Sequence, residues 1–191
     1  MKFTVIILAG GKSSRMGEHK ACMLLRGKPL IRYAIDLAGS LSAGIIISAN
    51  EHRAEYDGFP VVKDILPVSA PLAGIHAGLK SSRTDWNLVL SCDMPNLTKA
   101  LIEQLAGAID DRLKMVMPGH DGFVEPLCSF YHRDLVPVIE SNFLAGKISL
   151  LDLPAVVSHR VVELNDLSPA ECAFIFKNLN EKGDLTEKSA G

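Results

Sequence analysis

A pair of glycines and three basic residues lie together near the amino terminus. Gly10 and Gly11 end an apolar run, and Lys12, Arg15 and Lys20 follow within the same short segment. Glycine has no Cβ, so consecutive glycines let backbone N–H groups approach an anion and surround it. The basic side chains add charge of the opposite sign. This pattern predicts a loop that binds phosphate groups.

Two common phosphate-binding motifs do not fit this loop. A P-loop ending in Gly11, Lys12 and Ser13 would need a glycine at position 6, where the chain has Ile6. The dinucleotide fingerprint G-x-G-x-x-G would need a second glycine where Lys12 stands. The loop therefore belongs to a different class of phosphate site.

The elements around this loop predict where a ligand binds. Four apolar, β-branched runs read as buried parallel strands, at residues 3–9, 44–49, 59–63 and 86–92. Each is followed directly by a glycine or a polar residue: Gly10, Asn50, Asp64 and Asp93. Because ligands of open α/β sheets bind outside the carboxyl ends of the strands, we expect these residues to share one site.

Helical patterns alternate with the strands. Apolar residues at helical spacing predict helices at 29–39, 72–80, 98–109 and 134–144, and further strands are expected at 114–117, 124–131 and 156–164. This alternation predicts an α/β protein with a Rossmann-like three-layer α/β/α architecture and a mostly parallel sheet. At 191 residues, the chain is expected to form a single domain, 1–191.

The composition excludes several classes of function. With 48% hydrophobic residues, 22% charged residues and a net charge of −2, the chain lacks the basic excess that binding to duplex nucleic acid requires. No stretch approaches the roughly 20 apolar residues of a membrane span, and the first apolar run is too short for a signal peptide. The four cysteines are far apart, which favours buried thiols in a reducing compartment. We therefore expect a cytoplasmic protein with no nucleic-acid or membrane partner.

Taken as a whole, residues 8–20 match the pattern L-A-G-G-x-S-x-R-M-G-x-x-K, which resembles the signature of nucleoside-triphosphate transferases, specifically the molybdenum cofactor guanylyltransferase family. The resemblance continues in order along nearly the full chain, through G-K-P-L at 27–30, S-A-N at 48–50, Asp64, P-L-A-G at 71–74, C-D-M-P at 92–95, E-P-L at 125–127, and F-K-N-L-N at 176–180.

This resemblance implies transfer of GMP from GTP to molybdopterin, forming molybdopterin guanine dinucleotide and releasing pyrophosphate, with Mg²⁺ as cofactor. It assigns catalysis to Arg15, Lys20 and Asp93, and the metal to Asp93. The implied nucleotide-binding residues are Leu8, Ala9, Gly10, Gly11, Lys20, Asn50, Asp64, Gly74 and Asp93. It also implies a GTP-binding part at 1–113, an acceptor-side part at 114–191, and partners among molybdenum-enzyme apoproteins or cofactor chaperones.

The choice of nucleotide depends on two motifs. Relatives that use CTP typically carry L-A-A-G in the first motif and lack P-L-A-G, whereas this chain has Gly11 and the P-L-A-G segment at 71–74. The family often has Asn where this chain has Ser48, so Asn50 is the preferred base-side residue. The alternatives are a cytidylyl- or sugar-phosphate nucleotidyltransferase of the same fold, and a non-catalytic nucleotide-binding carrier of the cofactor.

Two roles remain open for several side chains. Asp93 could cap the turn before Met94 and Pro95 in place of holding a metal, and Lys28 reads as a solvated lysine at a helix start. Glu125 could position the acceptor or pair with Arg133. Surface or packing roles are expected for four histidines: His19, His76, His120 and His132.

Overall fold

A computed structural model describes residues 1–10 and 19–179 of the chain. Gly11, Lys12 and Arg15, three residues of the predicted phosphate loop, lie outside the described residues. Five α-helices occur in the described part: α1 (Leu30–Gly39), α2 (Pro71–Ser81), α3 (Lys99–Gly107), α4 (Leu135–Leu144) and α5 (Pro169–Ile175). None of the helices in these residues has the length and apolar character needed to cross a bilayer.

The strands form one eight-stranded sheet and a small hairpin. The sheet consists of β1 (Thr4–Leu8), β4 (Gly44–Ser48), β5 (Val61–Val62), β6 (Trp86–Ser91), β7 (Met115–His120), β8 (Phe123–Val124), β9 (Cys128–His132) and β10 (His159–Glu163). Its order is β10-β7-β9-β6-β1-β4-β5, with β8 paired to β7. The hairpin pairs β2 (Leu24–Leu25) with β3 (Lys28–Pro29). Three short 3₁₀ helices are η1 (Lys20–Cys22), η2 (Ala54–Tyr56) and η3 (Leu150–Asp152).

The sheet is mostly parallel, as the sequence predicts. Strands β5, β4, β1 and β6 are parallel neighbours, and β10 is parallel to β7. The exceptions are β9, which runs antiparallel to both β6 and β7, and β8, which runs antiparallel to β7. Every residue of β1 is buried, because this strand lies in the middle of the sheet with helices on both faces.

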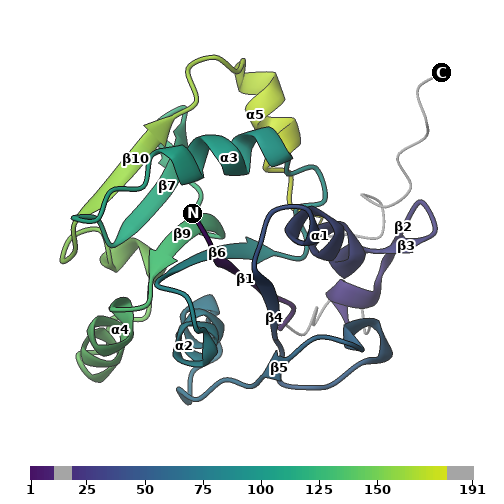
Figure 1. Cartoon of the computed structure of the whole chain (residues 1–191), viewed down its shortest axis with the longest axis horizontal. Coiled ribbons are helices and arrows are strands. Elements are labelled where there is room, and N and C mark those ends of the chain that lie inside the picture. Colours follow the sequence, from purple (N-terminus) through teal and green to yellow (C-terminus); the bar gives the residue numbers. More distant parts are fainter. Residues whose placement is uncertain (11–18, 180–191) are drawn as a thin grey trace.

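Helices cover both faces of the sheet, which confirms the three-layer fold (Figure 1). Val5 and Ile7 of β1 pack with α1, α3 and α5 on one face, whereas Ile6 and Leu8 pack with α2 and α4 on the other. Successive side chains of a strand point to opposite faces, so one buried strand serves two cores. This packing fixes the positions of the strand ends.

The sequence prediction was wrong in one part of the sheet. Residues 124–131, expected as one strand, are divided between β8 and β9 by a turn. The Glu125 N–H donates to the Pro118 carbonyl of β7 at 3.2 Å, whereas Leu127 already accepts from Ser91 of β6 at 3.0 Å. Pro126 between them has no N–H for a ladder. The prediction also missed α5, whose capping box is formed by Ser168 and Glu171.

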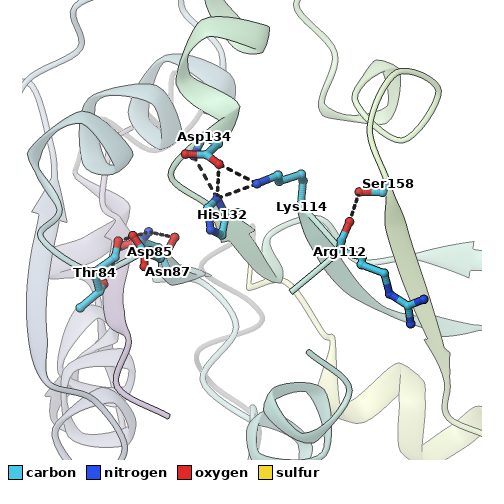
Figure 2. Close-up of polar contacts among 8 residues, drawn as sticks. All are labelled: Thr84, Asp85, Asn87, Arg112, Lys114, His132, Asp134 and Ser158. Carbon is cyan, nitrogen blue, oxygen red and sulfur yellow. Dashed lines mark hydrogen bonds and ion pairs between the residues drawn. The ribbon is translucent and has the colours of Figure 1, made fainter. Parts of the chain in front are cut away.

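A polar cluster closes the amino ends of β6 and β7 and the carboxyl end of β9, at the edge opposite to Asp93 (Figure 2). The Lys114 ammonium lies 2.6 Å from Asp134 Oδ2, and His132 Nδ1 accepts from the Asp134 N–H at 3.2 Å. Nearby, the Asn87 amide donates to the Thr84 carbonyl at 3.2 Å. Burial, and then the Lys114 charge, lower the pKa of His132, so this edge favours the neutral imidazole.

Candidate active site

The carboxyl ends of β4, β1 and β6 meet at one edge of the sheet. Leu8 of β1 is in register with Ser48 of β4 on one side and with Ser91 of β6 on the other. Hydrogen bonds continue beyond the strands, since the Ala9 N–H donates to the Ser48 carbonyl at 2.9 Å. From β1 the chain continues to β4 on one side, whereas the later strand β6 lies on the other side of β1. This reversal of strand order is a topological switch point, where open α/β sheets bind their ligands.

Lys20 and Asp93 form an ion pair at this edge, although 73 positions separate them in the sequence. Lys20 begins η1, and Asp93 follows β6 directly. The Ser91 hydroxyl donates to the other carboxylate oxygen, Oδ1, at 2.5 Å. The side chains are only 20% and 15% exposed, so their attraction is screened less than that of a surface pair. The structure thus brings together two of the three predicted catalytic residues.

Asn50 and Asp64 bind each other by two hydrogen bonds. The Asn50 amide nitrogen donates to Asp64 Oδ2 at 2.7 Å, and the Asp64 N–H donates to Asn50 Oδ1 at 3.0 Å. They follow the parallel neighbours β4 and β5. This double contact holds both predicted nucleotide residues in a fixed orientation at the same edge as Gly10 and Asp93.

Gly74 is buried in α2 beneath this edge. A Cβ built on it would lie 2.6 Å from Ser48 Oγ and 3.1 Å from Leu8 Cδ2. A side chain there would separate the helix from the ends of β1 and β4. The structure therefore gives a packing reason for this glycine, beside its predicted role in nucleotide binding. Ser48 is itself only 2% exposed, so its hydroxyl faces the helix contact.

Sequence reasoning missed a row of charged side chains next to Lys20. Glu51, immediately after Asn50, lies 3.0 Å from His19 Nε2 and 2.7 Å from an Arg53 nitrogen. Glu51 and His19 are far apart in the sequence, and no spacing pattern connects them. These contacts tie the segment after β4 to the segment that carries Lys20.

The thiols under the site have structural roles. Burial, the largest cause, raises the pKa of Cys92 to about 12 and that of Cys22 to about 11. Both thiols therefore stay protonated near neutral pH and are poor nucleophiles. All four cysteines are free, as the sequence predicts.

His120 ends β7, and Glu125 directly follows β8. Glu125 Oε1 is 3.2 Å from His120 Nε2, so among the described residues Glu125 pairs with His120 and not with Arg133. The His120 ring stacks on Phe176, with centroids 4.9 Å apart and planes within 5°. Further along this carboxyl-terminal segment, the Leu179 N–H donates to the Asp93 carbonyl at 3.0 Å. Residues 176–179 therefore connect the end of β7 to Asp93.

Asp93 is the candidate metal ligand at this edge. Within residues 1–10 and 19–179, no cluster of three or more His, Cys, Asp or Glu side chains could enclose a metal ion. Mg²⁺ does not need one, because it commonly binds one or two carboxylates together with water and substrate phosphates. Asp93 already holds the cationic ammonium of Lys20, and a carboxylate offers about four acceptor sites. The donor set therefore fits an ion that is shared with a phosphorylated substrate.

The fold and the edge formed by β1, β4 and β6 define a nucleotide-binding α/β protein of the nucleotidyltransferase type. The profile of the "MobA-like NTP transferase domain" matches residues 5–157, so the chain belongs to this family of nucleotidyltransferases. It is 36% identical to the molybdenum cofactor guanylyltransferase of Vibrio atlanticus over 186 residues, covering 95% of this chain and 93% of the relative. It is 30% identical to a probable molybdenum cofactor guanylyltransferase of Flavobacterium johnsoniae, covering 96% and 95% of the two chains.

Solved structures show the same fold. Molybdopterin-guanine dinucleotide biosynthesis protein A from Archaeoglobus fulgidus superposes with a TM-score of 0.77 at 22% identity, covering 96% of this chain and 95% of that one. A synthetase of CMP-2-keto-3-deoxy-manno-octonic acid, solved with CTP, superposes with a TM-score of 0.69 at 15% identity, covering 86% and 90%. At these identities the likeness concerns the fold alone.

Proposed function

We infer that the chain transfers GMP from GTP to molybdopterin and releases pyrophosphate. Relatives that carry the name molybdenum cofactor guanylyltransferase are 30–36% identical to it over about 95% of its length, which supports this substrate pair. The structural observation that carries the proposal is the Lys20–Asp93 pair at the edge formed by β1 and β6. It places a cation and a candidate metal ligand together beside Gly10.

Catalysis of this reaction depends on charge stabilisation and on the orientation of the substrates more than on proton transfer. The acceptor phosphate attacks the α-phosphorus of GTP, a new P–O bond forms, and the bond to pyrophosphate breaks. A phosphate monoester has its second pKa near 6, so it is largely dianionic at neutral pH and needs no general base. The main obstacle is repulsion between two polyanions. Fixed cations and aligned donors lower this barrier.

The residues of this chain divide that task. Lys20 would bind phosphate oxygens, together with Arg15 and the amides of Gly10 and Gly11. Asp93 would hold Mg²⁺, which supplies positive charge to the phosphates when it is bound. Asn50 and Asp64 would contact the base and ribose side of GTP, where Gly11 and the P-L-A-G segment favour guanine over cytosine.

The wider assignments are proposals of the same kind. Residues 1–113 would form the GTP-binding part and 114–191 the acceptor side, and one continuous sheet carries both. The product would pass to molybdenum-enzyme apoproteins or cofactor chaperones. The four free thiols support a reducing, cytoplasmic location.

The test uses two Lys–Asp pairs at opposite edges of the sheet. We expect Asp93→Asn to lower GMP transfer to molybdopterin by about 100-fold or more, the usual loss when one key electrostatic group is removed. Asp134→Asn, which breaks the pair with Lys114, is the matched control and should leave the rate unchanged. Equal rates for Asp93→Asn and wild type would contradict the proposed site.

Turnover with GTP, CTP and UTP separates the alternatives. GTP should be used at least tenfold better than the pyrimidine nucleotides. A preference for CTP would assign the chain to the cytidylyltransferases. Binding of GTP without turnover would favour a carrier of the cofactor.

A further inference from the structure

The β7–β8 hairpin projects at the carboxyl edge of the sheet, beyond β7. Asp121 and Gly122 connect its strands, and both have positive φ angles, 49° and 79°. Two central residues with positive φ make the tight turn whose twist matches that of paired strands. The hairpin is therefore a rigid support for the side chains on it.

Three side chains with complementary chemistry share one face of this hairpin. His120 pairs directly with Phe123, so these two project from the same face. Glu125 lies two positions after Phe123 and continues the pairing to Pro118, which places it on that face as well. The contact between His120 Nε2 and Glu125 Oε1 at 3.2 Å agrees with this arrangement.

Phe123 is exposed, whereas His120 and Glu125 are largely buried, and this difference suits a planar ligand. Phe123 is 69% exposed, so one aromatic ring stands in solvent. The His120 and Glu125 side chains are only 14% and 22% exposed, and His120 is fixed by its stack on Phe176. A single exposed aromatic residue is ordinary on a protein surface. A rigid carboxylate beside it, on the same face, is a more specific combination.

A short carboxyl-terminal segment connects this hairpin to Asp93. Phe176 stacks on His120, and the Leu179 N–H, three residues later, binds the Asp93 carbonyl. Three residues of extended chain span at most about 11 Å. Since β9 is antiparallel to both β6 and β7, the hairpin and Asp93 also lie at the same edge of the sheet.

We propose that Phe123 and Glu125 form the subsite for the pterin ring of the acceptor, with His120 as the residue that positions Glu125. The inference rests on the proposed function. The aminopyrimidinone ring of the acceptor's pterin is planar, and its edge carries adjacent N–H donors. Phe123 offers a face for stacking. The Glu125 carboxylate accepts from His120 and retains acceptor capacity for the N–H edge of the ring.

The arrangement explains how one site accepts a ligand with a ring at one end and a phosphate at the other. The ring would bind at the hairpin, and the terminal phosphate would be directed towards Asp93 and Lys20. Binding energy from the ring, away from the reacting atoms, would then orient the attacking phosphate.

Steady-state kinetics with the full chain test this subsite. Phe123→Ala should raise the KM for molybdopterin about tenfold, the usual effect of losing one stacking partner, and leave the KM for GTP unchanged. Phe123→Trp should keep the wild-type value. Phe174→Ala is the matched control, since Phe174 is 60% exposed on α5. An unchanged acceptor KM in Phe123→Ala, or an equal rise in Phe174→Ala, would overturn the proposal.

A binding measurement without turnover separates this proposal from the proposed function. Free 6-hydroxymethylpterin is the probe, and its fluorescence is titrated with wild type, Phe123→Ala and Glu125→Gln. Both variants should bind it at least several-fold more weakly, with thermal unfolding confirming that they are folded. Pterin binding in an enzyme that does not transfer GMP would reject the proposed function and keep the subsite. GMP transfer with equal pterin binding in all three proteins would reject the subsite alone.

Discussion

Two glycines of α2 offer a matched test of how the helix supports the site. Gly74 packs against Ser48 and Leu8 at the carboxyl edge, and Gly78 packs against Ile6 farther down β1, where its Cβ would lie 2.5 Å from Ile6 Cγ2. Overpacking of this kind costs about 1–3 kcal/mol. Replacing glycine by alanine inside a helix returns about 1 kcal/mol. Each alanine variant should therefore lose about 0–2 kcal/mol of stability, lowering Tm by up to about 8 °C.

The two variants should differ in function. Gly74→Ala pushes α2 away from Ser48, whose carbonyl binds the Ala9 N–H at the predicted nucleotide edge. We expect a several-fold rise in the KM for GTP. Gly78 lies beside Ile6, two residues earlier on β1, or about 7 Å away. Gly78→Ala should lower Tm by a similar amount and leave this KM unchanged.

Calorimetry and initial-rate kinetics on both variants check this reasoning. Adding Ser48→Ala to Gly74→Ala removes the hydroxyl at 2.6 Å and should recover part of the lost stability, giving a favourable coupling in a double-mutant cycle. If the KM for GTP rises equally in Gly74→Ala and Gly78→Ala, the cause is the overall loss of stability and not the local contact between Gly74 and Ser48. An unchanged KM for GTP in Gly74→Ala would show that Gly74 does not support the nucleotide site.

Two further predictions concern acid sensitivity and the carboxyl-terminal segment. Because the folded pKa of His132 is lowered, the unfolded chain binds more protons below pH about 6.5, and the free energy of unfolding should fall as pH drops below that value. The free energy of unfolding, measured with urea at several pH values between 7.5 and 5, should fall more steeply with decreasing pH for wild type than for His132→Asn. Equal pH dependence in the two proteins would contradict a lowered pKa of His132. Leu179→Ala should lower kcat several-fold, because Leu179 packs on Met23 near Lys20 and binds Asp93 through its backbone. The equally buried Leu153→Ala, in the opposite core, should lose about 2–5 kcal/mol of stability with no change in kcat, and an equal fall in kcat in both variants would exclude a positioning role.

Local pattern was enough to predict most of the elements. The buried strands at 3–9, 44–49 and 86–92 are recognisable because a strand covered on both faces is almost wholly apolar. The prediction failed at residues 124–131, where Pro126 interrupts the apolar run and the chain changes its pairing partner from β7 to β6. The missed helix α5 is only seven residues long and lies beyond the last predicted strand.

The sequence by itself determined that Gly10, Asn50, Asp64 and Asp93 end parallel strands, and therefore that they meet at one edge of the sheet. The glycine or polar residue that follows each apolar run marks the end of the strand, and this signal does not depend on how the helices pack. The resemblance of the motifs added the family, which the comparisons bear out.

Only the tertiary structure decided which of these side chains touch. Lys20 reaches Asp93, and Glu125 binds His120 and not Arg133. Helix α2 approaches the sheet so closely that a Cβ on Gly74 would lie 2.6 Å from Ser48 Oγ. Such contacts depend on register, and a shift of one residue in a strand moves its side chains to the other face. Register is fixed jointly by all the strands and by the two cores that cover them, so no local stretch of sequence contains it.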